Sequence, residues 1–252
     1  MRKRIGIIGI ILFSVLMIIG GIMYYRQYKD KKQSKAGFEK LETLVKEKDE
    51  VEDEVELEEP TAMDRYKELL ALNEDFVGWI QIEGTGVSYP VMQTKDRPDF
   101  YLKKNFEKQY SNYGVPYVQA NVDLDVSDNT VIYGHHMQDG TMFSDLTNYT
   151  SKSFYKGHKY IQFDTLSGYG KYEIISVFKT TAYLSKGFRY YLFVNTTEEQ
   201  EFDDYIATCK ELAFYDTGVT AEYGDKLITL STCEYTLHNG RLVVVAKKVA
   251  DE

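Results

Sequence analysis

The chain has 252 residues, of which 43% are apolar and 14% aromatic, a composition that excludes disorder along its whole length and supplies a sizeable core. Its two cysteines exclude a disulfide-rich scaffold. The first 35 residues carry eight basic residues and one acidic residue, a net of +7, so the total of −9 leaves −16 on the rest of the chain and excludes a basic nucleic-acid-binding domain.

Residues 5–25 form a run of 21 uncharged, mostly apolar residues, long enough as a helix to cross about 30 Å of hydrocarbon. The run predicts a single membrane-spanning anchor in the cell membrane. Basic residues flank the run on both sides, so the positive-inside rule alone does not decide the orientation. The very short N-terminal tail and the acidic chain after residue 36 favour residues 1–4 as a cytoplasmic tail and the rest of the chain outside the cell. The alternative is a cleaved signal peptide, whose apolar core is usually shorter and ends in a small-x-small site. Met23–Arg26 offers no such site, which favours the uncleaved anchor.

A charged spacer is expected over residues 26–60. Its second part, 36–59, holds eleven acidic residues and three lysines, and such a run is typically solvated. Apolar residues from Phe38 to Val45 are spaced as on one face of a helix, so part of the spacer is expected to be helical. We assign no chemistry to it, and we expect one folded domain over 61–252.

The folded domain is predicted to be mostly β. A short helix over 63–73, starting near Asp64 and ending near Asn73, comes first. Short apolar runs broken by Gly, Asn, Asp and Pro then indicate strands at 78–82, 87–92, 130–133, 160–163, 171–180, 226–232 and 241–249. These runs predict an antiparallel sheet closed, or nearly closed, into a barrel.

Two adjacent histidines, His135 and His136, follow the predicted strand 130–133 and a glycine, which indicates a position at the rim of the sheet. Adjacent strand residues face opposite sides, so the pair is not expected to bind one metal ion. We expect no metal site and no cofactor. His158 and His238 are interpreted as surface residues.

A second helix, over 198–213, is predicted by apolar residues at helical spacing. Thr197 and Gln200 have the spacing of a capping box at its start. Cys209 lies on the apolar face, where a small buried residue is expected, and a disulfide with Cys233 is the alternative.

Cys233 ends the apolar run that begins at Lys226 and precedes a polar stretch, so it is expected at the rim of the sheet. A nucleophile and an unpaired structural cysteine are equally compatible with these residues. An exposed thiol outside the cell is a liability, which favours the nucleophile.

The position of Arg241 relative to Cys233 depends on how their strands are connected. With a wide loop centred on Leu237, the two residues face each other on antiparallel strands, with Cα atoms about 5 Å apart. With a two-residue hairpin at Asn239–Gly240, Cys233 pairs with Ala246 and Arg241 lies about 17 Å away. Only the wide loop allows Arg241 to act together with Cys233.

Several motifs together resemble the sortases, specifically class B. They are NEDFVGWI at 73–80, YPVM at 89–92, YGH at 133–135 with MQDGTMF at 137–143, and TLSTC at 229–233 followed by Arg241. The resemblance covers about residues 63–249, and the TLxTC signature in this company is highly specific. A membrane anchor before an extracytoplasmic domain agrees with it.

The resemblance implies an eight-stranded sortase-type β-barrel with N-terminal helices and one helix before the cysteine strand. It implies a cysteine transpeptidase that cleaves an Asn-Pro-x-Thr-x-like C-terminal sorting signal of a surface protein after Thr and transfers it to a peptidoglycan amine. Cys233 would be the nucleophile, His135, rather than His136, the acid and base, and Arg241 the donor to the oxyanion or substrate carbonyl.

Three further residues are candidates for substrate binding. Ser231 and Thr232 precede Cys233, and Tyr183 lies between the strand 171–180 and the second helix. Strand packing explains the first two almost as well, and a core or surface aromatic is the alternative for the third.

The sequence is compatible with two other functions. One is a membrane-anchored, non-catalytic β-barrel binding module of the cell wall, in which Cys233 is unreactive. The other is a purely hydrolytic cysteine protease, in which water resolves the acyl-enzyme. With ordinary pKa values near 8.5 for Cys and 6.5 for His, the thiolate–imidazolium pair is about 1% as abundant as the neutral pair, so slow turnover is expected.

Overall fold

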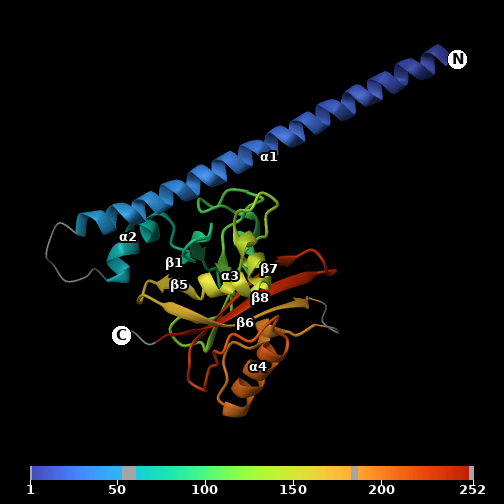
Figure 1. Cartoon of the computed structure of the whole chain (residues 1–252). Helices are drawn as coiled ribbons and strands as arrows, with labels where there is room; N and C mark the ends of the chain where they lie inside the picture. Colours follow the sequence, from blue (N-terminus) through green and yellow to red (C-terminus); the bar gives the residue numbers. More distant parts are fainter. Residues whose placement is uncertain (1, 53–60, 183–186, 250–252) are drawn as a thin grey trace.

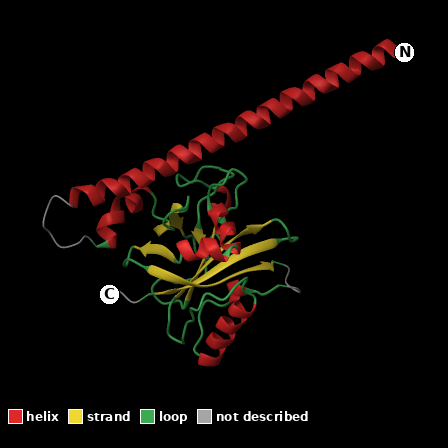
Figure 2. Ribbon diagram, viewed as in Figure 1, coloured by secondary structure: helices red, strands yellow, loops and turns green. Residues whose placement is uncertain are grey.

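The computed structural model describes the backbone of residues 2–52, 61–182 and 187–249, and within the first range the side chains of residues 12–46. The helices are α1 (Arg2–Glu52), α2 (Ala62–Leu72), α3 (Lys152–Gly157) and α4 (Glu199–Glu211), with 3-10 turns η1 (Phe100–Lys103), η2 (Phe143–Thr150) and η3 (Tyr190–Leu192). The strands are β1 (Phe76–Gln81), β2 (Ser88–Met92), β3 (Tyr117–Val118), β4 (Asn129–Tyr133), β5 (Tyr160–Thr165), β6 (Lys171–Thr181), β7 (Leu227–Glu234) and β8 (Gly240–Lys248). Helix α1 runs along one side of the strands, and α4 lies on the opposite side (Figures 1 and 2).

The strands of the described chain form a closed barrel in the order β1-β2-β3-β4-β7-β8-β6-β5. This confirms the predicted eight-stranded barrel with N-terminal helices and one helix, α4, before the cysteine strand. Fully buried apolar side chains such as Ile80, Ile132 and Leu230 form its core. The expectation of an antiparallel sheet holds for six of the eight described strand pairs and is wrong for two, because β2 and β3, and also β4 and β7, pair in parallel. The long crossover from β4 to β7, which contains helices and two strands, makes that parallel neighbour possible.

Strand β3 was not indicated by the sequence pattern. It has two residues, too few to show the alternation that marks a strand. Its neighbours define it instead: Tyr117 pairs with Met92 of β2, and Val118 pairs with Ile132 of β4.

Helix α2 begins and ends close to where the sequence predicted. Thr61 is its N-cap, and the Thr61 hydroxyl accepts a hydrogen bond of 3.2 Å from the backbone N–H of Asp64. Asn73 is the C-cap residue. A side-chain cap of this kind satisfies one of the N–H groups left without a partner at a helix start.

Helix α4 is confirmed, but the predicted capping box at its start is wrong. Its N-cap is Glu198, and in the described structure the Glu198 side chain makes no capping hydrogen bond. Instead, the Thr196 hydroxyl accepts a hydrogen bond from the Glu198 N–H and donates one to the Glu201 carboxylate. The chain therefore turns into the helix around Thr196 rather than Thr197.

The C-terminal half of α1 packs on the barrel, whereas a solvated spacer was expected there. Leu41 and Val45 are buried, and the Phe38 ring meets the Tyr89 ring edge-on at 5.1 Å between centroids. These residues have the helical spacing noted in the sequence. Burial of that apolar face makes this part of the charged segment a component of the folded body.

No helix among the described residues contains an apolar stretch long enough to cross a membrane. The predicted anchor, 5–25, falls only partly within the described side chains, which begin at Leu12. Its backbone is helical and continues into the part of α1 that lies along the barrel (Figure 1).

Candidate active site

Cys233 and Arg241 face each other on neighbouring antiparallel strands. The β7–β8 register pairs Cys233 with Arg241 and Glu234 with Gly240, so residues 235–239 form the connection. This confirms the wide loop and excludes the two-residue hairpin at Asn239–Gly240. Asn239 adopts a left-handed conformation with φ 51°, a local bend inside the loop.

The two cysteines of the chain lie in different environments, and both are free thiols. Cys209 on α4 is fully buried, as expected for a core residue, and burial raises the pKa of its thiol to about 12 although a hydrogen bond with Tyr205 lowers it. Cys233 is half-buried at the end of β7. The disulfide alternative is therefore wrong, and of the two thiols only that of Cys233 is partly exposed to solvent.

The parallel pairing of β4 with β7 brings the histidines to Cys233. Tyr133 pairs with Ser231, and the next residue, Gly134, donates its N–H to the Ser231 carbonyl at 3.1 Å. The Thr232 hydroxyl donates to the Gly134 carbonyl at 2.8 Å. His135 thus emerges from its strand beside the end of the cysteine strand.

Gly134 is required where the chain enters this site. A Cβ added to it would lie 2.5 Å from a carbon of the Phe143 ring, which is fully buried. We expect Gly134→Ala to lower stability by about 1–3 kcal/mol, because the ring or the strand must move. Thermal unfolding should show a melting temperature lowered by several degrees. Gly168→Ala, with nothing within 4 Å of the added carbon, is the matched control; an equal effect of the two changes would contradict this account.

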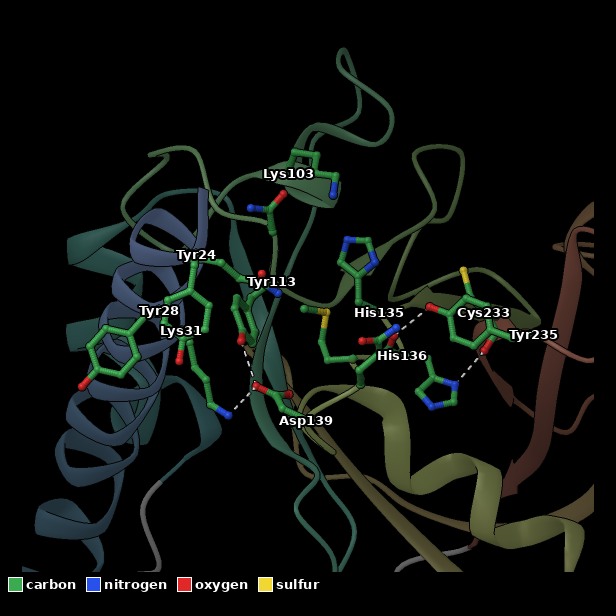
Figure 3. Close-up of a pocket in the computed structure, with 14 residues that line it drawn as sticks. Tyr24, Tyr28, Lys31, Lys103, Tyr113, His135, His136, Asp139, Cys233 and Tyr235 are labelled. Atoms are coloured by element: carbon green, nitrogen blue, oxygen red, sulfur yellow. Dashed lines mark hydrogen bonds and ion pairs between the residues drawn. The ribbon is translucent and has the colours of Figure 1, made fainter. Parts of the chain in front are cut away.

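The two histidine rings make different contacts. His135 Nε2 lies 2.7 Å from the Leu102 carbonyl, and His136 Nδ1 lies 3.1 Å from the Cys233 carbonyl. A carbonyl only accepts, so each of these nitrogens carries the proton. The His136 ring also packs on the Tyr235 ring, 5.1 Å between centroids. Figure 3 shows the His135 ring on the side of the Cys233 sulfur, with the His136 ring turned toward the cysteine backbone.

A cavity of about 900 Å³ connects these groups. Cys233, Tyr235, His135 and His136 line one part of it, and residues of α1 line the other (Figure 3). Its lining comprises Tyr24, Gln27, Tyr28, Lys31, Lys103, Asn112, Tyr113, His135, His136, Met137, Gln138, Asp139, Cys233 and Tyr235. A thiol and an imidazole that share one accessible cavity are the parts that nucleophilic acyl transfer requires.

Arg241 is the cross-strand partner of Cys233 but is outside the described lining of this cavity. Its guanidinium Nη1 donates to the Gly240 carbonyl at 2.9 Å, and its side chain is half-buried. Burial raises the pKa of Tyr133 and Tyr190, and the positive charge of Arg241 opposes that rise at both phenols. The guanidinium thus acts electrostatically on these two tyrosines from β8, the strand that pairs with the cysteine strand.

The other predicted site residues take different places. Ser231 is buried and its hydroxyl shares a 2.6 Å hydrogen bond with the Tyr190 hydroxyl. Thr232 is buried and bound to Gly134, as described above. The hydroxyl groups of Ser231 and Thr232 therefore both form hydrogen bonds within the folded domain. Tyr183 lies outside the described residues.

The α1 residues of the cavity were missed by the sequence analysis. Tyr24, Gln27, Tyr28 and Lys31 have the spacing of one helical face, which was visible in the sequence. That this face meets the site depends on how α1 docks on a barrel formed far along the chain. Among the described residues, no three His, Cys, Asp or Glu side chains cluster as metal ligands.

Comparisons with known proteins agree with one another. A family model described as the sortase domain matches residues 80–249. The chain is similar to sortase B of Staphylococcus aureus (33% identical over 250 residues, 97% of each chain) and of Listeria monocytogenes (36% over 192 residues, 74% of each). Among solved structures, it is similar to a Staphylococcus aureus sortase B-substrate complex (TM-score 0.79, 31% identical, covering 89% of this chain and 100% of that one) and to Clostridium perfringens sortase B (TM-score 0.65, 30% identical, covering 73% and 99%).

Proposed function

Because this chain belongs to the sortase family and is a cysteine transpeptidase of the sortase B type, we propose specific catalytic roles for Cys233, His135 and Arg241 and a specific class of substrate. The observation that carries the proposal is the shared cavity, which is lined by both the half-buried residue Cys233 and His135.

The first half-reaction uses Cys233 as the nucleophile. Its thiolate attacks the threonine carbonyl of the sorting signal, and a C–S bond forms as the carbonyl oxygen becomes an oxyanion. His135, as the imidazolium, gives its proton to the departing amine when the C–N bond breaks. The surface protein is then held on Cys233 as a thioester, and the C-terminal fragment leaves.

The second half-reaction runs through the same two residues. His135, now neutral, takes a proton from the incoming amine of the peptidoglycan peptide as that amine attacks the thioester. The new amide forms, and the Cys233 thiolate leaves. Water in place of the amine would give hydrolysis, so the partition between the two products separates a transpeptidase from a hydrolytic protease.

Contacts in the structure support His135 over His136 for this role. The Nδ1–H of His136 donates to the Cys233 carbonyl, and the His136 ring packs on the Tyr235 ring. These contacts suit a residue that holds the backbone of Cys233 in place. The Nε2–H of His135 is directed at the Leu102 carbonyl, which leaves Nδ1 as the basic atom of that ring.

Arg241 is proposed as the donor to the oxyanion or the substrate carbonyl. Its support is the register, since it is the direct cross-strand partner of Cys233. A guanidinium keeps its charge at every pH at which the thiolate reacts, so it stabilises an oxyanion without a proton of its own. To do so it must give up, or share, the hydrogen bond with the Gly240 carbonyl.

The pH dependence of the reaction follows from the environment of His135. Burial lowers the pKa of its ring below the ordinary value of 6.5; Lys103 also lowers it, and the hydrogen bond with Leu102 raises it in part. In a thiolate–imidazolium pair, activity falls on the acid side with the lower of the two pKa values. We expect kcat/KM for a sorting peptide to fall at low pH with a midpoint below 6.5. A midpoint above about 7 would contradict this assignment.

The proposed donor is a surface protein with an Asn-Pro-x-Thr-x-like sorting signal, and the proposed acceptor is an amine of the peptidoglycan peptide. The relatives support this choice: one similar structure is a sortase B-substrate complex, and another is a sortase B complexed with triglycine. The test incubates the enzyme with a panel of Pro-x-Thr peptides and triglycine. We expect ligated product to outgrow hydrolysed product as triglycine rises; hydrolysis alone at every concentration would point to a protease.

We also propose that residues 5–25 anchor the enzyme in the cell membrane, with residues 1–4 inside and the catalytic domain from residue 61 facing the wall. The support is the uncharged run of 21 residues. After cell fractionation, the full-length protein is expected in the membrane pellet and resistant to alkaline carbonate. Recovery of a shortened, soluble protein would instead indicate cleavage near the end of the run.

A further inference from the structure

Helix α1 reaches the proposed active site. Tyr24, Gln27, Tyr28 and Lys31 line the same cavity as Cys233 and His135. At this wall of the cavity, the helix makes two sets of polar contacts with loops of the barrel, one from Lys31 and one from the adjacent Asp30. Each set ends on a loop that borders His135.

Lys31 holds the tip of the loop that follows His135. This loop closes on itself, because the Phe143 N–H donates to the His135 carbonyl at 2.8 Å. At its tip, the Asp139 carboxylate pairs with Lys31 Nζ at 3.1 Å and accepts a hydrogen bond of 2.8 Å from the Tyr113 hydroxyl (Figure 3). Burial opposes ionisation of Asp139, but hydrogen bonds from Thr141, Tyr113 and Lys31 outweigh it and lower its pKa to about 2. The Asp139 carboxylate is therefore charged at neutral pH.

Asp30 holds the chain on the other side of His135. Its carboxylate accepts hydrogen bonds from the Ser111 hydroxyl (2.8 Å) and from the Asn112 N–H (2.9 Å). Ser111 in turn donates its N–H to the Lys103 carbonyl at 3.1 Å. The neighbouring carbonyl, that of Leu102, is the partner of His135 Nε2. A continuous series of contacts thus leads from α1 to the imidazole.

The free energy of these contacts indicates whether they act mainly on the stability of the fold or on the rate of the reaction. Lys31 is half exposed, and an ion pair of this kind contributes about 1 kcal/mol or less to global stability. Its loss should leave the barrel folded. A shift of about 1 Å in a reacting group, however, costs up to about a hundredfold in rate. These contacts therefore matter for the placement of His135 far more than for stability.

We propose that Asp30 and Lys31 of α1 are positioning residues of the active site, which hold the two loops flanking His135 so that its ring meets Cys233 and the substrate. Helix α1 then contributes to catalysis by positioning His135, and it also links the folded domain to the N-terminal segment. This inference rests on the proposed role of His135. It adds residues that precede the matched sortase domain, which begins at residue 80.

The test is a double-mutant cycle in the full-length protein. We expect Lys31→Met to lower kcat for thioester formation about tenfold, with KM for the sorting peptide changed less than twofold and the melting temperature lowered by at most about 4 °C. Asp139→Asn should have a similar effect. Since the two residues act through one contact, Lys31→Met in the Asp139→Asn background should cause little further loss.

Lys35→Met is the matched control, because Lys35 lies one turn further along the same exposed helix and pairs with Glu39 of α1 itself. It removes the same charge and should keep wild-type kcat. Wild-type kcat in Lys31→Met, or additive losses in the double variant, would overturn the proposal. An inactive wild-type protein would instead count against the proposed function, so the two failures are distinguishable.

Discussion

Replacing Cys233 with alanine is expected to lower kcat/KM for a sorting peptide by at least about a thousandfold. Alanine cannot form the thioester, so both half-reactions stop, and the fold should survive because the side chain is half-buried at a strand end. Cleavage of a fluorogenic peptide measures the loss. Unchanged biological function in this variant would favour the non-catalytic binding module over the enzyme.

The second cysteine supplies the control. Cys209→Ala removes the other thiol but lies on the buried face of α4, so it should retain catalysis and lose about 1 kcal/mol of stability. Iodoacetamide should alkylate Cys233 in the native protein and spare Cys209, whose thiol is fully buried and whose pKa burial raises to about 12.

His135→Ala is the second change with a large expected effect. General acid–base catalysis by a placed imidazole is worth about a hundredfold to ten-thousandfold, so kcat should fall by that range for both thioester formation and transfer to the amine. His136→Ala should cost about tenfold or less in kcat, because it removes a hydrogen bond to the Cys233 carbonyl and the contact with Tyr235.

The pair of histidine variants also shows how the assignment could fail. An inactive His136→Ala beside an active His135→Ala would reverse the roles of the two residues. The melting temperature of each variant is measured as a control, because inactivity of an unfolded His136→Ala protein would say nothing of the role of His136 in catalysis. His136→Asn, which can still donate to the Cys233 carbonyl, should then recover activity.

The sequence predicted the barrel because most of its strands are long enough to show their pattern. Seven apolar runs coincide with seven strands, and Cys233 and His135 could be placed at strand ends from local pattern alone. The two-residue strand at Tyr117–Val118 could not, because its identity comes from pairing with β2 and β4. The parallel neighbours of the barrel escaped prediction for the same reason.

The candidate site could be predicted only where residues close together in the sequence determine it. Spacing left two connections open between Cys233 and Arg241, and only the observed register decides between them. Ser231 precedes the cysteine closely, yet its hydroxyl binds Tyr190 of a distant turn. The part of the cavity that α1 lines depends on the docking of this helix through the Lys31–Asp139 ion pair. The two residues lie more than 100 positions apart in the sequence, and no local pattern encodes such a contact.

The central claim is that Cys233 carries the surface protein as a thioester before an amine releases it. Mass spectrometry of the intact full-length protein, mixed with an Asn-Pro-x-Thr-x peptide and no acceptor, tests it directly. We predict an adduct equal to the peptide up to its threonine less one water, located on Cys233 and lost on addition of triglycine as the ligated product appears. No adduct with any Pro-x-Thr peptide, or an adduct on another residue, would contradict the account.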